Sequence, residues 1–290
     1  MAVTDRTLPV RGVTLADAWR SFRTAIGLGW AIEANWSDPF LFAVYTMAKP
    51  LAAAGILVVM IQVITHGQNP EFLQFLIVGS ALWNVVFGVM SGLVQSILED
   101  RERYRMMKYV VVTPSSLFPF LLGRSLARVL LSFIAVVLTM AVGIVFLGVQ
   151  LQVSLPYLIA ATVVGVLAVM ALGVFMAGWC LQLRQEAWHY PEAIAGALYL
   201  ISGAIFPIDI LPSVLHPLAL GSPTTWWLEA SRRGLLGHGS PGMLGELSDA
   251  IVLLYLVVST AVVVPLALAL FSWFMRRARQ AGLLDMVTGS

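Results

Sequence analysis

Six long apolar stretches are the feature that most constrains how this chain can fold. They cover about residues 40–64, 72–98, 117–148, 155–181, 193–211 and 249–275. Most exceed the roughly 18 residues, with few charges, at which a helix can cross a bilayer. Charged residues make up only 11% of the chain, against roughly 25% in soluble domains. We therefore predict an all-α membrane protein with six transmembrane helices.

The positions of Lys and Arg predict how these helices are oriented. Basic residues precede the first stretch, separate the second from the third, and follow the fourth and the sixth: Arg6, Arg11, Arg20, Arg23, Arg101, Arg103, Arg105, Lys108, Arg184, Arg276, Arg277 and Arg279. The connections after the first and third stretches contain neither Lys nor Arg. Because cytoplasmic loops are enriched in these residues, we expect a multi-pass protein of the plasma (bacterial inner) membrane with both termini in the cytoplasm.

Residues 14–34 precede the first stretch and predict an amphipathic helix lying in the membrane interface. Apolar residues recur at steps of three or four, beside Arg20 and Arg23: Leu15, Trp19, Phe22, Ile26 and Trp30. Such a stripe next to basic residues is typical of an interfacial helix, although a helix packed on protein shows it too. The predicted organisation is a cytoplasmic N-terminus with this helix (1–37), a six-helix transmembrane domain (38–280) and a cytoplasmic tail (281–290).

The fifth stretch is interrupted where an ordinary span would continue. It carries Gly203, Pro207, Asp209 and Pro212, and proline breaks a helix. Non-helical backbone at membrane depth is tolerated only where protein or a water-filled cavity covers it. We predict an incomplete span over 193–206, a turn, and a re-entrant or interfacial helix near 223–236. Arg232 and Arg233, the exceptions to the charge pattern, would lie at the outer interface of that helix.

Motifs for catalysis are missing from the sequence. It contains no Gly-Lys pair, so it has no phosphate-binding loop of the G-x-x-x-x-G-K-[ST] type, and no H-E-x-x-H or G-x-S-x-G. The lone Cys180 excludes an internal disulfide and a multi-cysteine metal site. The four histidines are scattered over separate loops: His66, His189, His216 and His238. We expect no catalytic residue, no metal site and no cofactor bound by this chain.

Residues 98–116, LEDRERYRMMKYVVVTPSS, join the second and third stretches. They combine a dense run of mixed charges with a Thr113-Pro114 stop. Mixed charges at helical spacing are often only a solvated face. A short charged helix below the bilayer would also suit docking in a groove on a cytosolic partner.

This segment resembles the loop between spans two and three of the type-2 permeases of ATP-binding-cassette exporters. In that family the loop forms a coupling helix that contacts the ATPase. The resemblance implies this role for Glu99, Asp100, Arg101, Glu102, Arg103, Arg105 and Lys108. The Gly-Thr common in the family's loop is absent, and Tyr104 and Arg105 stand near its place. ATP and Mg²⁺ would bind to the partner ATPase subunits.

The interrupted fifth stretch resembles the same family. The shared pattern is Ser202-Gly203, Phe206-Pro207, Leu211-Pro212, Pro223-Thr224, Glu229, Arg232 and Leu235-Leu236-Gly237. It implies an outer re-entrant segment over 203–238 that includes Gly203, Phe206, Pro207, Pro212, Glu229 and Arg232. Glu229 and Arg232 lie three apart, so on a helix they can pair. Such a pair would account for a positive charge on the outside.

The resemblance implies the permease subunit of an ATP-driven exporter, paired with a second permease chain of the same or a related kind. Residues expected to line the path are Trp83, Phe87, Met90 and Tyr199. An amphipathic drug, antibiotic or lipid is the expected substrate, with a polysaccharide or lipid-linked glycan as the alternative. An ion-coupled transporter would need carboxylates buried within its spans. Lys49 and Asp209 are the charged residues that come closest to such a position, and of the two only Asp209 is a carboxylic acid. An intramembrane enzyme would need a catalytic cluster.

Overall fold

The computed structural model describes residues 15–34, 38–65, 70–107, 117–183, 187 and 189–283, and the regular structure within these ranges is entirely helical. The longer helices are α1 (Leu15–Ala34), α2 (Pro39–Thr65), α3 (Pro70–Leu98), α5 (Leu117–Leu147), α6 (Leu155–Cys180), α7 (Tyr190–Ile201), α9 (Pro223–Leu236) and α10 (Asp249–Gln280). The prediction of an all-α protein is confirmed.

Four segments of the described chain are long and apolar enough to cross a membrane. They are Glu71–Arg103, Pro119–Leu147, Leu155–Cys180 and Asp249–Gln280. Helix α2, with 27 residues, has a similar length, although several of its side chains, that of Lys49 among them, lie outside the described residues. These helices support a multi-pass membrane protein.

The fifth apolar stretch does not form one helix. Helix α7 has 12 residues, about 18 Å at 1.5 Å per residue, which is shorter than the roughly 30 Å hydrocarbon core. The chain then turns at Gly203, whose φ of +74° is in the left-handed region that favours glycine. A 3₁₀ turn, η2 (Ile208–Ile210), and the short helix α8 (His216–Gly221) lead into α9.

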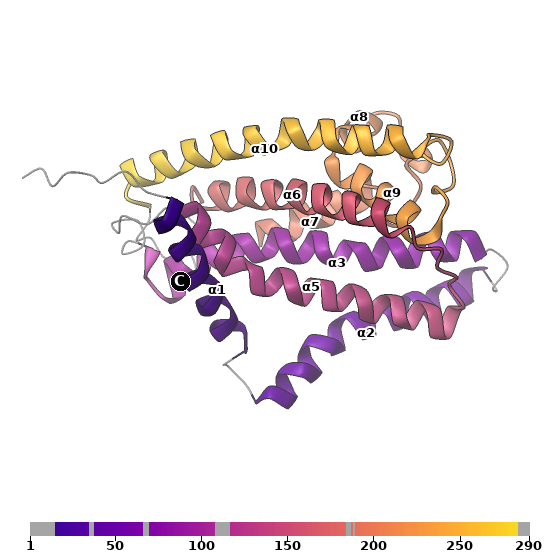
Figure 1. Ribbon diagram of the computed structural model, residues 1–290, viewed down its shortest axis with the longest axis horizontal. Coiled ribbons are helices and arrows are strands. Elements are labelled where there is room, and N and C mark those ends of the chain that lie inside the picture. Colours follow the sequence, from indigo (N-terminus) through magenta and orange to yellow (C-terminus); the bar gives the residue numbers. More distant parts are fainter. Residues whose placement is uncertain are drawn as a thin grey trace, which may run out of the picture.

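Helix α3 is the centre of the bundle. It packs against α5, α6, α7 and α9, and its side chains supply much of the buried apolar core. Figure 1 shows α3, α5, α6 and α10 running side by side along the long axis. Helices α1 and α2 pack on α5, and α10 packs on α6 and α9.

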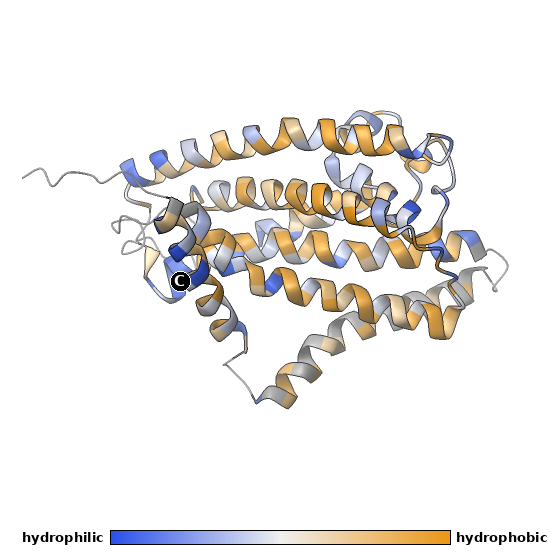
Figure 2. Cartoon of the chain, in the orientation of Figure 1, coloured by the Kyte–Doolittle hydropathy of each residue, from blue (hydrophilic) through white to orange (hydrophobic). Residues whose placement is uncertain are grey.

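The two ends of the bundle differ in charge. In Figure 2 the middle of the long helices is hydrophobic, whereas hydrophilic residues gather at the two ends. The end formed by α1, residues 99–107 and the last turns of α10 is called the basic end here. Its exposed basic side chains are Arg20, Arg23, Arg103, Arg105, Arg276, Arg277 and Arg279. The opposite end, residues 202–248, is called the hairpin end.

Helix α1 packs tightly on α5 through small residues. A Cβ on Gly29 would lie 2.5 Å from the Arg124 carbonyl oxygen, and one on Gly123 would lie 2.4 Å from the Phe22 carbonyl oxygen. On other faces of α1, Trp19 and Trp30 are 64% and 49% exposed. The helix therefore has a protein-packed face and exposed tryptophans, and its position in the membrane interface stays a prediction.

Gly165 of α6 allows a close contact between α6 and Trp227 of α9, and its replacement by alanine should destabilise the bundle. A Cβ there would lie 1.7 Å from Cδ1 of Trp227, a side chain that is 1% exposed. Overpacking of this kind costs about 1–3 kcal/mol. We expect a lower melting temperature in detergent for Gly165→Ala.

Gly55→Ala in α2 is the matched control, because a Cβ at that position meets no atom within 4 Å. Its melting temperature should stay close to that of the wild type. Equal melting temperatures for both variants would contradict the close packing of α6 on Trp227.

Candidate functional site

The charged segment, residues 99–107, begins as a direct continuation of α3. Residues Glu99–Arg103 form one turn of π-helix, η1. The turn is closed by hydrogen bonds from the Tyr104 amide to the Glu99 carbonyl (2.8 Å) and from the Met106 amide to the Asp100 carbonyl (2.9 Å). Arg105 follows at a φ of +50°, where the chain turns sharply away from the α3 axis.

The first part of this segment is buried, so the alternative of a solvated charged face is wrong for it. Glu99 is 9% exposed, Asp100 is 0% and Arg101 is 1%. Arg101 pairs with Glu102 and donates to the Leu181 carbonyl (3.4 Å). These acidic and basic side chains lie within the protein, where charges are retained when they are paired.

Two arginines of α5 hold the buried carboxylates in place. Arg124 donates from Nη2 to Oε2 of Glu99 (3.0 Å), and its Nε lies 3.6 Å from Oδ1 of Asp100. Arg128 donates from Nη2 to Oε1 of Glu99 (2.7 Å) and from Nε to Oε1 of Glu33 (2.5 Å). This ion network joins α1, the end of α3 and α5, so the three elements cannot move independently without breaking it.

Residues 103–105 of the charged segment are exposed. Arg103, Tyr104 and Arg105 present their side chains at the surface, and the Arg103 guanidinium lies 5.6 Å from the centre of the Tyr104 ring. Arg103 and Tyr104 also line a hollow of about 280 Å³ beside Glu33 and Arg128. Arg103, Tyr104 and Arg105 are called the exposed turn below. Lys108, also predicted to contact a partner, lies outside the described residues.

Arg232 of α9, which is 2% exposed, holds the turn after α7 against α3. Its Nη2 donates to the carbonyl oxygens of Gly203 (2.8 Å) and Ala204 (3.0 Å). Its guanidinium carbon lies 3.8 Å from the centre of the Phe75 ring, a cation–π contact. Burial lowers the pKa of Arg232 to about 10. Gly79 lets these groups approach, because a Cβ there would lie 2.1 Å from the Ala204 oxygen.

The predicted pair between Glu229 and Arg232 is wrong. Glu229 instead accepts a hydrogen bond from Nε of Arg233, one residue further on (2.9 Å), while Arg232 turns to the hairpin carbonyls. Arg233 also donates to the Leu247 carbonyl (2.6 Å) and pairs with Asp249 (2.8 Å). Both arginines are buried within the protein rather than exposed at the outer interface, which accounts for their exception to the charge pattern.

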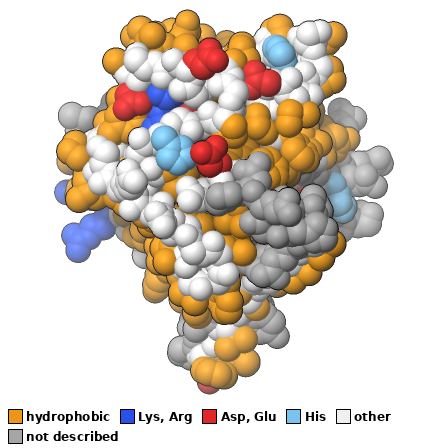
Figure 3. Space-filling model, turned by 90° about the vertical axis from the view of Figure 1, so that its right-hand side faces the viewer, with side chains coloured by type: hydrophobic (Ala, Val, Ile, Leu, Met, Phe, Trp, Pro, Cys, Tyr) orange, Lys and Arg blue, Asp and Glu red, His pale blue; other side chains and the backbone are white. Residues whose placement is uncertain are grey.

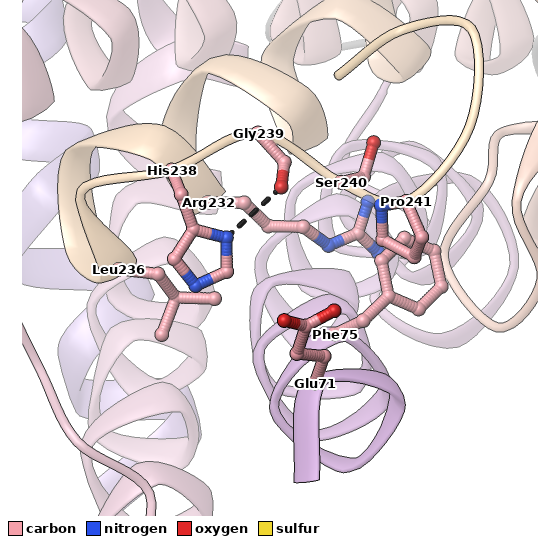
Figure 4. A pocket seen from close by; sticks show the side chains of 8 residues that line it. All are labelled: Glu71, Phe75, Arg232, Leu236, His238, Gly239, Ser240 and Pro241. Carbon is pink, nitrogen blue, oxygen red and sulfur yellow. Dashed lines mark hydrogen bonds between the residues drawn. The ribbon is translucent and has the colours of Figure 1, made fainter. Parts of the chain in front are cut away.

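A second hollow, of about 300 Å³, lies beside Arg232 at the hairpin end. Figure 4 shows the Arg232 guanidinium directed between Phe75 and Pro241, with Glu71 and His238 on the other side of the hollow. The His238 Nδ1 lies 3.0 Å from the Gly239 carbonyl oxygen. Viewed from this end, the surface carries several acidic side chains (Figure 3); Glu71, Asp209, Glu246 and Asp249 are exposed here.

The remaining hairpin residues shape the turn. Phe206 is 44% exposed, Pro207 precedes the 3₁₀ turn, and Pro212 lies between that turn and α8. Asp209 accepts hydrogen bonds from the Met243 amide at 3.1–3.2 Å, so it fastens the hairpin to the following loop. It does not lie in the middle of a span.

Three of the four predicted path residues share one hollow of about 450 Å³ between α2, α3, α5 and α7. Trp83 and Phe87 line it from α3 and Tyr199 from α7. Met90 lies elsewhere: it is 2% exposed and packs where α3 meets Gly173 of α6. The hollow is called the α3–α7 pocket below. Lining of a transport path by these residues stays a prediction.

Sequence reasoning missed several charged residues that the fold brings together. Arg124 and Arg128 occur within an apolar stretch at a spacing of four, so both lie on one helix face. This spacing is the sequence signal that could have identified them as a pair with a common partner. Glu33 is distant in sequence from its partner, and no local pattern identifies it. Glu192, just before the fifth apolar stretch, lines the α3–α7 pocket. In the described residues no group of three or more His, Cys, Asp or Glu could hold a metal ion.

Comparison with protein families assigns most of these features to one domain. The model of the ABC-2 type transporter family matches residues 28–236, more than half of the chain. The matched region contains the charged segment, the α3–α7 pocket and the hairpin end up to residue 236. No curated protein matches the chain.

Proposed function

Because the chain belongs to the ABC-2 type transporter family, it is a membrane-embedded permease subunit of an ABC transporter, and we propose that it exports an amphipathic substrate. Separate ATPase subunits supply the energy, since this sequence has no phosphate-binding loop of its own. A second permease chain, of the same or a related kind, completes the path. A drug, an antibiotic or a lipid is the proposed cargo.

The observation that carries the proposal is the link between the exposed turn and the ion network. Arg103, Tyr104 and Arg105 offer an exposed basic and aromatic surface, while Glu99 directly before them is bound to α5 through Arg124 and Arg128. A force applied to the turn by an ATPase is therefore delivered to α3 and α5 as one unit. Among the residues predicted for coupling, Glu99, Asp100 and Arg101 anchor the turn, and the exposed residues make the contact.

Orientation follows from the distribution of exposed charge. The exposed arginines are concentrated at the basic end, so that end faces the cytoplasm of the bacterial inner membrane in this proposal, and both chain termini with it. The hairpin end then faces outward and closes the outer part of the path. The α3–α7 pocket, between these ends, receives the substrate.

Purification of the protein from its native membrane tests this function. The expected result is a co-purifying ABC ATPase, together with ATP-dependent uptake of an amphipathic compound into inside-out vesicles. A complex that moves only glycans would favour the alternative cargo, a polysaccharide or lipid-linked glycan. Uptake that requires an ion gradient and persists without ATP would instead indicate a secondary transporter.

A further inference from the structure

The α3–α7 pocket combines a drug-sized volume with a distinctive set of polar groups. Its volume of about 450 Å³ is within the roughly 300–1,000 Å³ of small-molecule sites. Ser80, Trp83, Asn84 and Phe87 line it from α3, and Glu192, Gly196 and Tyr199 line it from α7. Residues 192, 196 and 199 follow the three- and four-residue spacing of a single helix face. A Cβ added to Gly196 would meet no atom within 4 Å, so this glycine leaves open space between Glu192 and Tyr199.

One wall of the pocket is aromatic. The rings of Trp83 and Tyr199 are 4.9 Å apart between centroids and tilted by 33°, and the Tyr199 hydroxyl lies 3.2 Å from the Ser80 hydroxyl. Phe87, one helical turn from Trp83, is 38% exposed. Aromatic faces carry partial negative charge and attract cations as well as apolar groups.

Two polar groups of the pocket, those of Asn84 and Thr139, have hydrogen-bonding capacity that no described residue uses. The Asn84 amide nitrogen donates to the carbonyls of Ser80 and Ala81 (3.2 Å each), and its oxygen has no donor among the described residues. Thr139 is 3% exposed, and its hydroxyl has no hydrogen-bond partner among the described residues. A buried polar group without a partner costs free energy unless a ligand or water satisfies it. The Asn84 oxygen can only accept, so it favours a ligand that donates a hydrogen bond.

Glu192 is the one ionisable carboxylic acid among the described residues that line the pocket. It lies in the first turn of α7, seven residues and therefore about 10 Å along the helix from Tyr199. Arg232, a buried cation, lies on the Tyr199 side at the hairpin end, where it binds the Gly203 and Ala204 carbonyls. The pocket is thus negative at the Glu192 end and aromatic towards Arg232.

We propose that the α3–α7 pocket binds an amphipathic organic cation, with Glu192 as the counter-ion of a protonated amine. The amine lies at the Glu192 end, within reach of the Asn84 oxygen, and the apolar body lies against Trp83 and Tyr199. The assignment of this ligand as transported cargo rests on the proposed export function. Glu192 determines specificity: it selects for positive charge.

Equilibrium binding to the purified full-length protein in lipid nanodiscs tests the proposal without ATPase or transport. The probes are dansylcadaverine, a fluorescent primary amine, and its N-acetylated form, which has no charge. We expect the wild type to bind the amine about tenfold more tightly than the acetylated probe. Glu192→Gln should abolish this preference, while Glu246→Gln, a matched change at the exposed hairpin end, should keep it.

A steric variant locates the binding site. Gly196→Leu places a larger side chain in the open space of the pocket and should weaken binding of both probes by at least about tenfold. Equal affinity of the wild type for both probes, no binding of the amine, or an unchanged preference in Glu192→Gln would each overturn the proposal. A protein that binds the amine as expected but shows no ATP-driven transport would contradict the proposed export function alone.

Discussion

Glu229→Ala should severely destabilise the hairpin end of this permease. Glu229 is fully buried and accepts hydrogen bonds from Nε of Arg233 (2.9 Å) and from the amide of Ser240 (3.1 Å). Without it, the buried Arg233 charge loses its one buried carboxylate partner among the described residues, and breaking a buried pair costs about 3–5 kcal/mol. The melting temperature in detergent should fall by on the order of 10 °C.

The same guanidinium provides the matched control. Asp249→Asn removes the other carboxylate of Arg233, at 2.8 Å from Nη1, but this side chain is 68% exposed. Exposed ion pairs contribute only about 0–1 kcal/mol, so the melting temperature should change little. Similar losses in the two variants would show that burial does not determine the strength of these contacts.

Reversing the charge of the exposed turn should uncouple transport from ATP hydrolysis. In Arg103→Glu with Arg105→Glu, two exposed guanidinium groups become carboxylates, and under the proposed coupling role the ATPase surface that faces the turn would then repel it. Like charges facing each other across an interface cost several kcal/mol. We expect ATP-driven uptake into vesicles to fall by about tenfold or more, with an unchanged melting temperature.

Arg276→Glu with Arg279→Glu is the control for this pair. Both residues are exposed at the same end of the molecule, on α10, and should affect uptake much less. If the control loses as much uptake as the turn variant, the effect comes from net charge at the basic end. Glu99 is unsuitable for such a test, because its loss would also break the network with Arg124 and Arg128.

The helices could be predicted from the sequence because lipid imposes a strong pattern. Apolar stretches at 72–98, 117–148 and 155–181 agree with α3, α5 and α6 to within a few residues, since each must satisfy its backbone hydrogen bonds internally. The end of α7 could also be anticipated. Gly203 and Pro207 follow it within a few residues, and both disfavour a continuous helix.

Side-chain partners could not be predicted, because they depend on which helix faces meet. Arg232 and Arg233 are both within helical reach of Glu229, and the packing of the hairpin on α3 decides between them: Arg232 faces Gly203 and Phe75, so Arg233 takes the carboxylate. The position of Met90 has the same cause. It lies on α3 with Trp83 and Phe87, but it is 2% exposed and its Cα lies where α3 meets Gly173 of α6.

The ion network shows the same dependence on tertiary structure. The run Glu99, Asp100, Arg101 has the composition of a solvated helix face. It is buried because Arg124 and Arg128 of α5 bring opposite charges to the same place. In the described part of this segment, Arg103, Tyr104 and Arg105 keep the exposure that the charge pattern predicts.

Photo-crosslinking from the exposed turn tests the central claim most directly. Tyr104, 39% exposed, is replaced by p-benzoyl-L-phenylalanine, and illumination of native membranes is followed by mass spectrometry of the adduct. Position 273 serves as the control, because Trp273 is 51% exposed on α10, away from the turn. The account predicts an adduct between position 104 and an ABC ATPase that position 273 does not give. The account would be contradicted if position 104 formed adducts only with lipid, or only with proteins that do not bind nucleotides.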